Sequence, residues 1–103
     1  MASELILTPD AARDIEEAVE YYELQRAGLG ARFFAAVTTC LEGVVRTPEM
    51  YRVIEDDIRR ALVRKFPYAI FYDSDADTVS VYCVIHTSRN PEDWRRRVRP
   101  DGS

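Results

Sequence analysis

The chain has 103 residues, of which 47% are hydrophobic and 31% charged, and its formal net charge is −4. These values are typical of a small globular protein, so we expect a single domain over residues 1–103 rather than a disordered chain. The opening sequence MASELILTPD predicts no signal peptide, and no apolar run reaches membrane-spanning length. We therefore expect a cytoplasmic protein that makes no membrane contact.

The first predicted elements are a strand and a helix. Residues 4–8 form a short apolar run, and Thr8, Pro9 and Asp10 follow as a capping residue, a first-turn proline and a first-turn acid. Apolar residues then recur at helical spacing as far as Tyr22, and glutamates occupy the positions between them. The helix is therefore predicted to be amphipathic, with an acidic outer face.

A second helix is predicted after the segment Ala27–Gly30, whose glycines break the pattern, and it ends before Pro48. A short glycine link between two helices favours an antiparallel hairpin. We expect the apolar stripe of the second helix to pack in the core; it consists of Phe33, Phe34, Val37, Leu41, Val44 and Val45.

The second half of the chain is predicted to be mainly β-sheet. Residues 59–66, 67–73 and 78–87 show the alternation of strands, and the polar segment DSDAD at 73–77 marks a hairpin. The last of these strands is apolar on both faces, which indicates an interior position in the sheet.

A short C-terminal helix is predicted from the sequence Asn90-Pro91-Glu92-Asp93, which is typical of a helix start. We expect it to end near Val98 and to be followed by a frayed tail at 99–103. The predicted fold is therefore α+β: a small, mostly antiparallel sheet with a mixed edge, backed by an N-terminal helical hairpin, in the order β-α-α-β-β-β-α.

No metal or cofactor site is expected. Asp73, Asp75 and Asp77 alternate like the start of a calcium loop, but Thr78 and Val84 occupy the positions that need glycine and glutamate. The chain has one histidine, its two cysteines lack ligand spacing, and no phosphate-binding glycine motif is present. We expect Cys40 and Cys83 to be buried free thiols.

Charge is distributed unevenly along the chain. Residues 1–57 hold 12 acidic and 5 basic side chains, whereas residues 58–103 hold 6 acidic and 9 basic ones. One interpretation is a surface for a polyanion or an acidic partner, and the other is ordinary solvation of two faces. The candidate group of basic and aromatic side chains comprises Arg59, Arg60, Arg64, Lys65, Tyr68, His86, Arg89, Arg95, Arg96 and Arg97.

The sequence resembles the RelE/ParE superfamily of bacterial type II toxin–antitoxin systems. The resemblance covers roughly residues 4–98, and its most specific segments are FPYAIFY at 66–72 and VIHTSRNPEDW at 84–94. It implies a compact toxin, a cognate antitoxin whose tail wraps and neutralises it, and a toxin–antitoxin hetero-oligomer.

Two activities are implied by this resemblance. RelE-like members cut mRNA on the ribosome with cationic side chains and a tyrosine, whereas ParE-like members inhibit DNA gyrase. Arg60 and Arg89 would be the catalytic residues of a RelE-like enzyme. Ala69, however, stands where those enzymes place an arginine, and the only aromatic residue after Arg89 is Trp94.

These departures favour the ParE-like activity. The alternatives are a RelE-like endonuclease, whose partners would be the ribosome and mRNA, and a non-toxic module that only binds a partner. The candidates for contact with the target are Arg64, Lys65, Tyr68, His86, Arg89, Arg95, Arg96 and Arg97.

Overall fold

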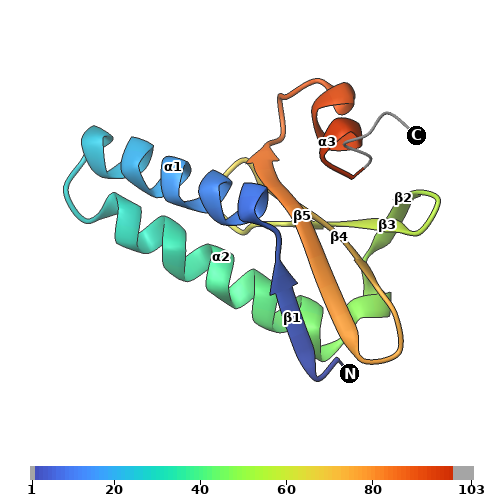
Figure 1. The fold of residues 1–103 in the computed structure, drawn as a ribbon. Helices are drawn as coiled ribbons and strands as arrows, with labels where there is room; N and C mark the ends of the chain where they lie inside the picture. Colours follow the sequence, from blue (N-terminus) through green and yellow to red (C-terminus); the bar gives the residue numbers. More distant parts are fainter. Residues whose placement is uncertain (1, 99–103) are drawn as a thin grey trace.

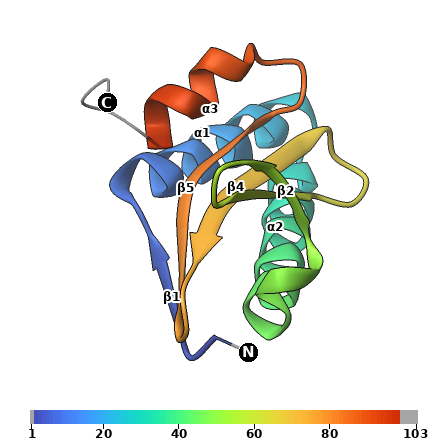
Figure 2. The ribbon, with the colours of Figure 1, turned by 90° about the vertical axis from the view of Figure 1, so that its right-hand side faces the viewer.

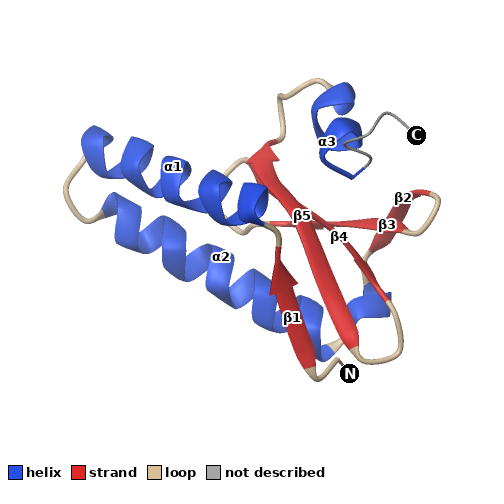
Figure 3. Cartoon of the chain, in the orientation of Figure 1, coloured by secondary structure: helices blue, strands red, loops and turns tan. Residues whose placement is uncertain are grey.

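The computed structural model describes residues 2–98, and the tail predicted for 99–103 lies outside these residues. Figure 1 shows a sheet with a helical hairpin on one side and a short helix on the other, and Figure 3 separates helices from strands. The elements are β1 (Glu4–Leu7), α1 (Pro9–Gln25), α2 (Leu29–Arg46), the 3-10 turn η1 (Pro48–Met50), β2 (Arg52–Glu55), β3 (Ile58–Leu62), β4 (Tyr68–Ser74), β5 (Thr78–His86) and α3 (Pro91–Val98). The predicted α+β class and helical hairpin are confirmed.

The five strands are arranged in the order β1-β5-β4-β3-β2. β1 pairs in parallel with β5, and the other three pairs are antiparallel. The hairpin of α1 and α2 supplies part of the long connection that leads from β1 to the rest of the sheet (Figure 2). The mixed edge is as predicted, and β5 is covered by a strand on each side, although the central strand of the five is β4.

The structure differs from the sequence prediction around the third strand. β2 was not predicted; it follows the hairpin along the chain, precedes β3, and forms an edge of the sheet. β3 also ends at Leu62 instead of Phe66, because the chain turns there: the N–H of Val63 donates to the carbonyl of Tyr68, and Lys65 has φ 69°. Asp56 has φ 51° in the tight turn between β2 and β3, a conformation that aspartate tolerates better than most residues.

Two hydrophobic cores lie on opposite faces of the sheet. The larger one packs the hairpin against the sheet and includes Phe33, Ile70 and Tyr72. The smaller one packs α3 against the other face, where the ring of Trp94 stacks on that of Phe71 at 5.1 Å between centroids. Both faces of β4 and β5 are therefore covered, which explains why these strands are apolar on both sides.

The hairpin begins as the sequence predicts but differs on its outer face. The hydroxyl of Thr8 accepts a hydrogen bond from the N–H of Ala11 and so caps α1. Phe34, in contrast, was predicted to be buried and is 54% exposed. It sits next to Phe33 in the sequence, and successive residues of a helix point about 100° apart, so only Phe33 reaches the core. None of the helices in residues 2–98 is long and apolar enough to cross a membrane.

Candidate functional site

A polar pocket of about 210 Å³ opens between α1 and the ends of β4 and β5. Three of the predicted residues lie together here: Tyr68 at the start of β4, His86 at the end of β5, and Arg89 in the loop that follows. Tyr68 and His86 are directly opposite each other in the β4–β5 ladder, and their rings meet edge to face. Antiparallel pairing therefore brings together residues that are 18 positions apart.

The wall of the pocket on α1 was not predicted from the sequence. It consists of Asp14, Glu17, Ala18 and Tyr21. These positions follow the i, i+3, i+4, i+7 spacing of one helix face. Asp14 also stands among the apolar positions of α1, and a carboxylate in an apolar stripe is the sequence signal that would have identified it.

His86 and Tyr68 are arranged to donate hydrogen bonds to a bound partner rather than to accept a proton from it. The Nδ1 atom of His86 lies 3.0 Å from the N–H of Ser88, which donates to it, and 2.8 Å from the hydroxyl of the same serine. We assign the ring proton of the neutral form to Nε2 on this basis, which makes that atom a donor. Burial raises the pKa of Tyr68, so its phenol stays protonated at neutral pH.

Arg89 lies at the rim of the pocket and is held by Asp93. Its Nε donates to the carboxylate at 2.9 Å, and this hydrogen bond lowers the pKa of Asp93. About half of the Arg89 side chain remains accessible, with an exposed fraction of 51%. The pocket therefore presents a guanidinium to solvent beside three aromatic rings and the carboxylate of Glu17.

The three arginines of α3 are engaged within the chain. Arg97 makes two hydrogen bonds to the carboxylate of Asp14, at 2.9 and 2.8 Å. Arg95 bonds Glu55 and Glu92 and lies over the ring of Trp94, and Arg96 bonds Asp93. Arg97 therefore links α3 to α1, and Arg95 links α3 to β2, while all three arginines contribute positive charge.

The remaining predicted residues occupy two other places. Arg64 and Lys65 are exposed in the turn between β3 and β4, at the same end of the sheet as Tyr68. Arg60 points to the face that α3 covers, because its ladder partner is Phe71. Arg59 points to the opposite face, where its guanidinium donates to the carbonyls of Glu49 and Tyr51.

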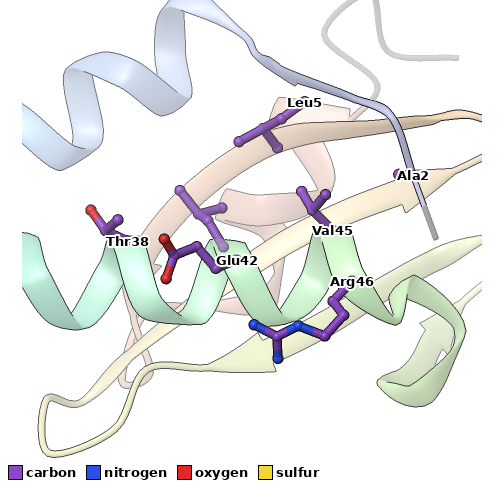
Figure 4. Close-up of a pocket in the computed structure, with 7 residues that line it drawn as sticks. Ala2, Leu5, Thr38, Glu42, Val45 and Arg46 are labelled. Atoms are coloured by element: carbon purple, nitrogen blue, oxygen red, sulfur yellow. The ribbon is translucent and has the colours of Figure 1, made fainter.

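The outer face of the hairpin carries two apolar pockets. One, of about 380 Å³, lies between β1 and α2, with Leu5 and Val45 on its walls and Glu42 and Arg46 at its rim (Figure 4). The other, of about 440 Å³, is lined by Ile15, Glu16, Val19, Glu20, Glu23, Leu24 and Phe34. Leu24 is 81% exposed, so this face carries apolar surface that nothing in the described chain covers.

Comparison with known proteins adds to this description. A family model described as "ParE toxin of type II toxin-antitoxin system, parDE" matches residues 5–91. A solved chain from "Chromosomal ParDE TA system from P. aeruginosa" is similar in fold, with a TM-score of 0.71 and 12% sequence identity over 84% of this chain and 96% of that one. No curated protein matches the sequence.

Proposed function

Because the chain belongs to the family of ParE toxins of type II toxin–antitoxin systems, we propose that it arrests bacterial growth by inhibiting DNA gyrase in the cytoplasm. We further propose that a cognate antitoxin neutralises it in a toxin–antitoxin hetero-oligomer. Both steps require binding surfaces, and neither requires the chain itself to make or break a covalent bond.

The state of His86 and Tyr68 favours this function over cleavage of mRNA on the ribosome. A ribonuclease that activates the ribose 2′-hydroxyl needs a group that accepts a proton. The Nδ1 lone pair of His86 is occupied by Ser88, and the pKa of Tyr68 is raised, which disfavours the phenolate. Ala69 is buried under α3 and offers no charge to a phosphate.

The proposed target-binding residues are those predicted from the sequence. Arg64, Lys65, Tyr68, His86 and Arg89 lie at one end of the sheet and are accessible in whole or in part. Arg95, Arg96 and Arg97 extend the positive charge along α3, although each is also bonded to a carboxylate of the chain. We expect them to act mainly by holding α3 in place beside Arg89.

The hairpin supports the proposal of an antitoxin that covers it. Phe34, Leu41 and Val45 are spaced along one stripe of α2, and the two apolar pockets lie along this stripe. The stripe from residue 34 to residue 45 is about 16 Å long at a helical rise of about 1.5 Å per residue. The acidic rim of Glu16, Glu20 and Glu23 suits an amphipathic segment with apolar anchors and basic flanks.

The function is tested by tightly controlled expression of the chain alone in bacteria, with pulse labelling of DNA and protein synthesis in the first minutes. We expect DNA synthesis to fail first, and the purified chain to inhibit supercoiling by purified gyrase. Co-expression of the antitoxin encoded beside the gene should restore growth.

Two other outcomes would select the alternatives. Early failure of protein synthesis, with transcript cleavage that Arg60→Ala abolishes, would favour the ribosome-dependent endonuclease. Undisturbed growth in the presence of folded chain would reduce the protein to a module that binds its partner without toxicity.

A further inference from the structure

Arg52 and Arg60 form a pair of like charges on the sheet. They are directly opposite each other in the β2–β3 ladder, and Arg60 is in turn opposite Phe71 of β4. Both side chains therefore point to the face that α3 covers only in part. Like charges at directly opposed positions destabilise a sheet. A pair of this kind therefore needs an explanation outside the folding of the chain.

Within residues 2–98, the side chains of Arg52 and Arg60 make no hydrogen bond and no ion pair. The contrast with neighbouring arginines is clear. Arg59, on the other face of β3, bonds two carbonyls, and Arg95 bonds the carboxylate of Glu55 at the end of β2. Arg52 is exposed and Arg60 is half-buried, so within residues 2–98 both side chains are accessible at least in part.

One exposed apolar side chain lies on the same face as this pair, and a second lies close to it in the sequence. Leu62 follows Arg60 by two positions on the same strand, so it points to the same face, and it is 57% exposed. Met50 is 79% exposed and lies just before β2. Arginine and methionine are enriched in protein–protein interfaces, where arginine often contributes most of the binding energy.

We propose that this arginine face, defined by Met50, Arg52, Arg60 and Leu62, docks an acidic segment of the toxin's target protein. The inference rests on the proposed function and adds a surface outside the pocket of Tyr68, His86 and Arg89. Each guanidinium binds a carboxylate of the target with paired hydrogen bonds, and the two apolar side chains pack beside that contact.

A protein partner suits this face better than a nucleic acid. Proteins that track a phosphate backbone present a basic stripe that neutralises many phosphates. Here the β2–β3 ladder pairs two arginines, Arg52 and Arg60, and the acidic turn of Asp56 and Asp57 lies at the end of the same two strands. A long run of phosphates would reach that turn and be repelled by it, whereas a short protein segment needs only one or two carboxylates, placed at the arginine pair.

The test compares two double variants for binding to purified gyrase without DNA. Arg52→Gln/Arg60→Gln removes the proposed contact and the cross-strand repulsion, so it should fold at least as stably, with an equal or higher urea midpoint. Arg26→Glu/Arg32→Glu is the control at the tip of the hairpin. We expect affinity for gyrase and inhibition of supercoiling to fall at least about tenfold in the first variant and to stay within about twofold in the control.

The outcomes separate this inference from the proposed function. If the unmodified chain neither binds nor inhibits gyrase, both are wrong. Where the unmodified chain inhibits gyrase and Arg52→Gln/Arg60→Gln inhibits it equally, only the docking surface is wrong. A further outcome would contradict the assignment of a protein partner to this face. In it, the unmodified chain binds a single-stranded RNA or DNA 20-mer, and Arg52→Gln/Arg60→Gln abolishes that binding while gyrase binding is unchanged.

Discussion

The carboxylate of Asp14 joins three parts of the molecule. It accepts a hydrogen bond from the backbone N–H of Val84 at 3.0 Å and two more from Arg97. β1 pairs with β5 only as far as Val81, so Val84 has lost its strand partner on that side. Asp14 therefore satisfies the open edge of β5 and also anchors the C-terminal helix to α1.

We expect Asp14→Ala to lower the free energy of unfolding by about 3–5 kcal/mol, because it leaves the partly buried Arg97 and a buried N–H without their acceptor. Arg13→Ala is the matched control: Arg13 bonds Asp10 at a similar 2.8 Å, but both side chains are about half exposed. Its cost should stay below about 1 kcal/mol. Urea unfolding measures both, and equal costs would show that Asp14 does not hold α3.

The phenol of Tyr72 and two thiols predict an alkaline limit to stability; Cys83 is buried as expected, whereas Cys40 is only half-buried. Burial raises the pKa of Tyr72 and Cys83 to about 12 each, and that of Cys40 to about 11. Unfolded tyrosine and cysteine lose their protons near pH 10 and pH 9, so above these values the folded state binds more protons than the unfolded state. The contribution of these groups to stability should therefore be constant up to about pH 9 and decrease as the pH rises towards 12.

Tyr72→Phe isolates one part of this effect. The hydroxyl of Tyr72 donates to the carbonyl of Pro48 at 2.6 Å, so the variant should be about 1 kcal/mol less stable at pH 8. The difference between the two proteins should shrink between pH 10 and 12, as the unfolded phenol ionises. Urea midpoints over this range provide the measurement, and a constant difference would contradict the assignment to Tyr72.

At the scale of elements, α3 is too short to be stable by itself. It spans the eight residues Pro91–Val98, and its one buried side chain is Trp94. We expect Trp94→Ala to cost about 3–5 kcal/mol. The amides of residues 92–98 should lose protection from hydrogen exchange while those of α1 and α2 keep it. Retained protection in α3 would show that its ion pairs are enough to hold it.

The hairpin depends on close contact between its two helices at Gly30. A Cβ at this position would lie 2.7 Å from the carbonyl oxygen of Val19 and 3.0 Å from the carboxylate of Glu23. Gly30→Ala should therefore push α2 away from α1 and cost about 1–3 kcal/mol, as measured by thermal or urea unfolding. Ala31→Ser, on the exposed side of the same turn, should stay within about 0.5 kcal/mol. An equally neutral Gly30→Ala would indicate that the helices separate without cost.

Local patterns in the sequence predicted the elements whose causes are local. Thr8 caps α1 through an atom three residues away, and the alternation of β4 and β5 reflects burial on both faces of each strand. β2 was missed because four residues, RVIE, carry too few alternations, and its pairing with β3 depends on a two-residue acidic turn. Such a strand is defined by its neighbour rather than by its own residues.

The same distinction applies to the candidate site. Of the basic and aromatic residues singled out in the sequence, Tyr68, His86 and Arg89 line one pocket, because adjacent strands and a short loop place them together. Arg97 and Arg95 were predicted as contacts with the target, and their acceptors within the chain, Asp14 and Glu55, lie 83 and 40 positions away in the sequence. Ion pairs over such separations depend on the tertiary fold, and one sequence carries no signal for them.

At the scale of the whole molecule, the surface proposed for the antitoxin and the proposed arginine face lie on different sides of the sheet. The hairpin presents apolar pockets with an acidic rim, whereas the face that carries α3 presents Arg52 and Arg60. An antitoxin segment that covers only the hairpin would leave the arginine face open. We therefore expect neutralisation to need a segment that extends from the hairpin over the edge of the sheet.

The exposed apolar surface of the hairpin is expected to take part in association with other chains. Leu24 and Phe34 are 81% and 54% exposed beside one pocket, so their burial against the antitoxin is favourable. When no antitoxin is present, a second toxin chain can cover the same side chains. Leu24→Ser/Phe34→Ser should reduce self-association of the purified chain and weaken binding of the cognate antitoxin at least about tenfold. Its unfolding free energy should change by no more than about 1 kcal/mol, because neither side chain is in the core.

Light scattering after gel filtration, urea unfolding and titration calorimetry measure these three effects, with the exposed pair Ala31→Ser/Ala35→Ser as the control. If the variant binds the antitoxin as tightly as the unmodified chain does, the antitoxin contacts another surface.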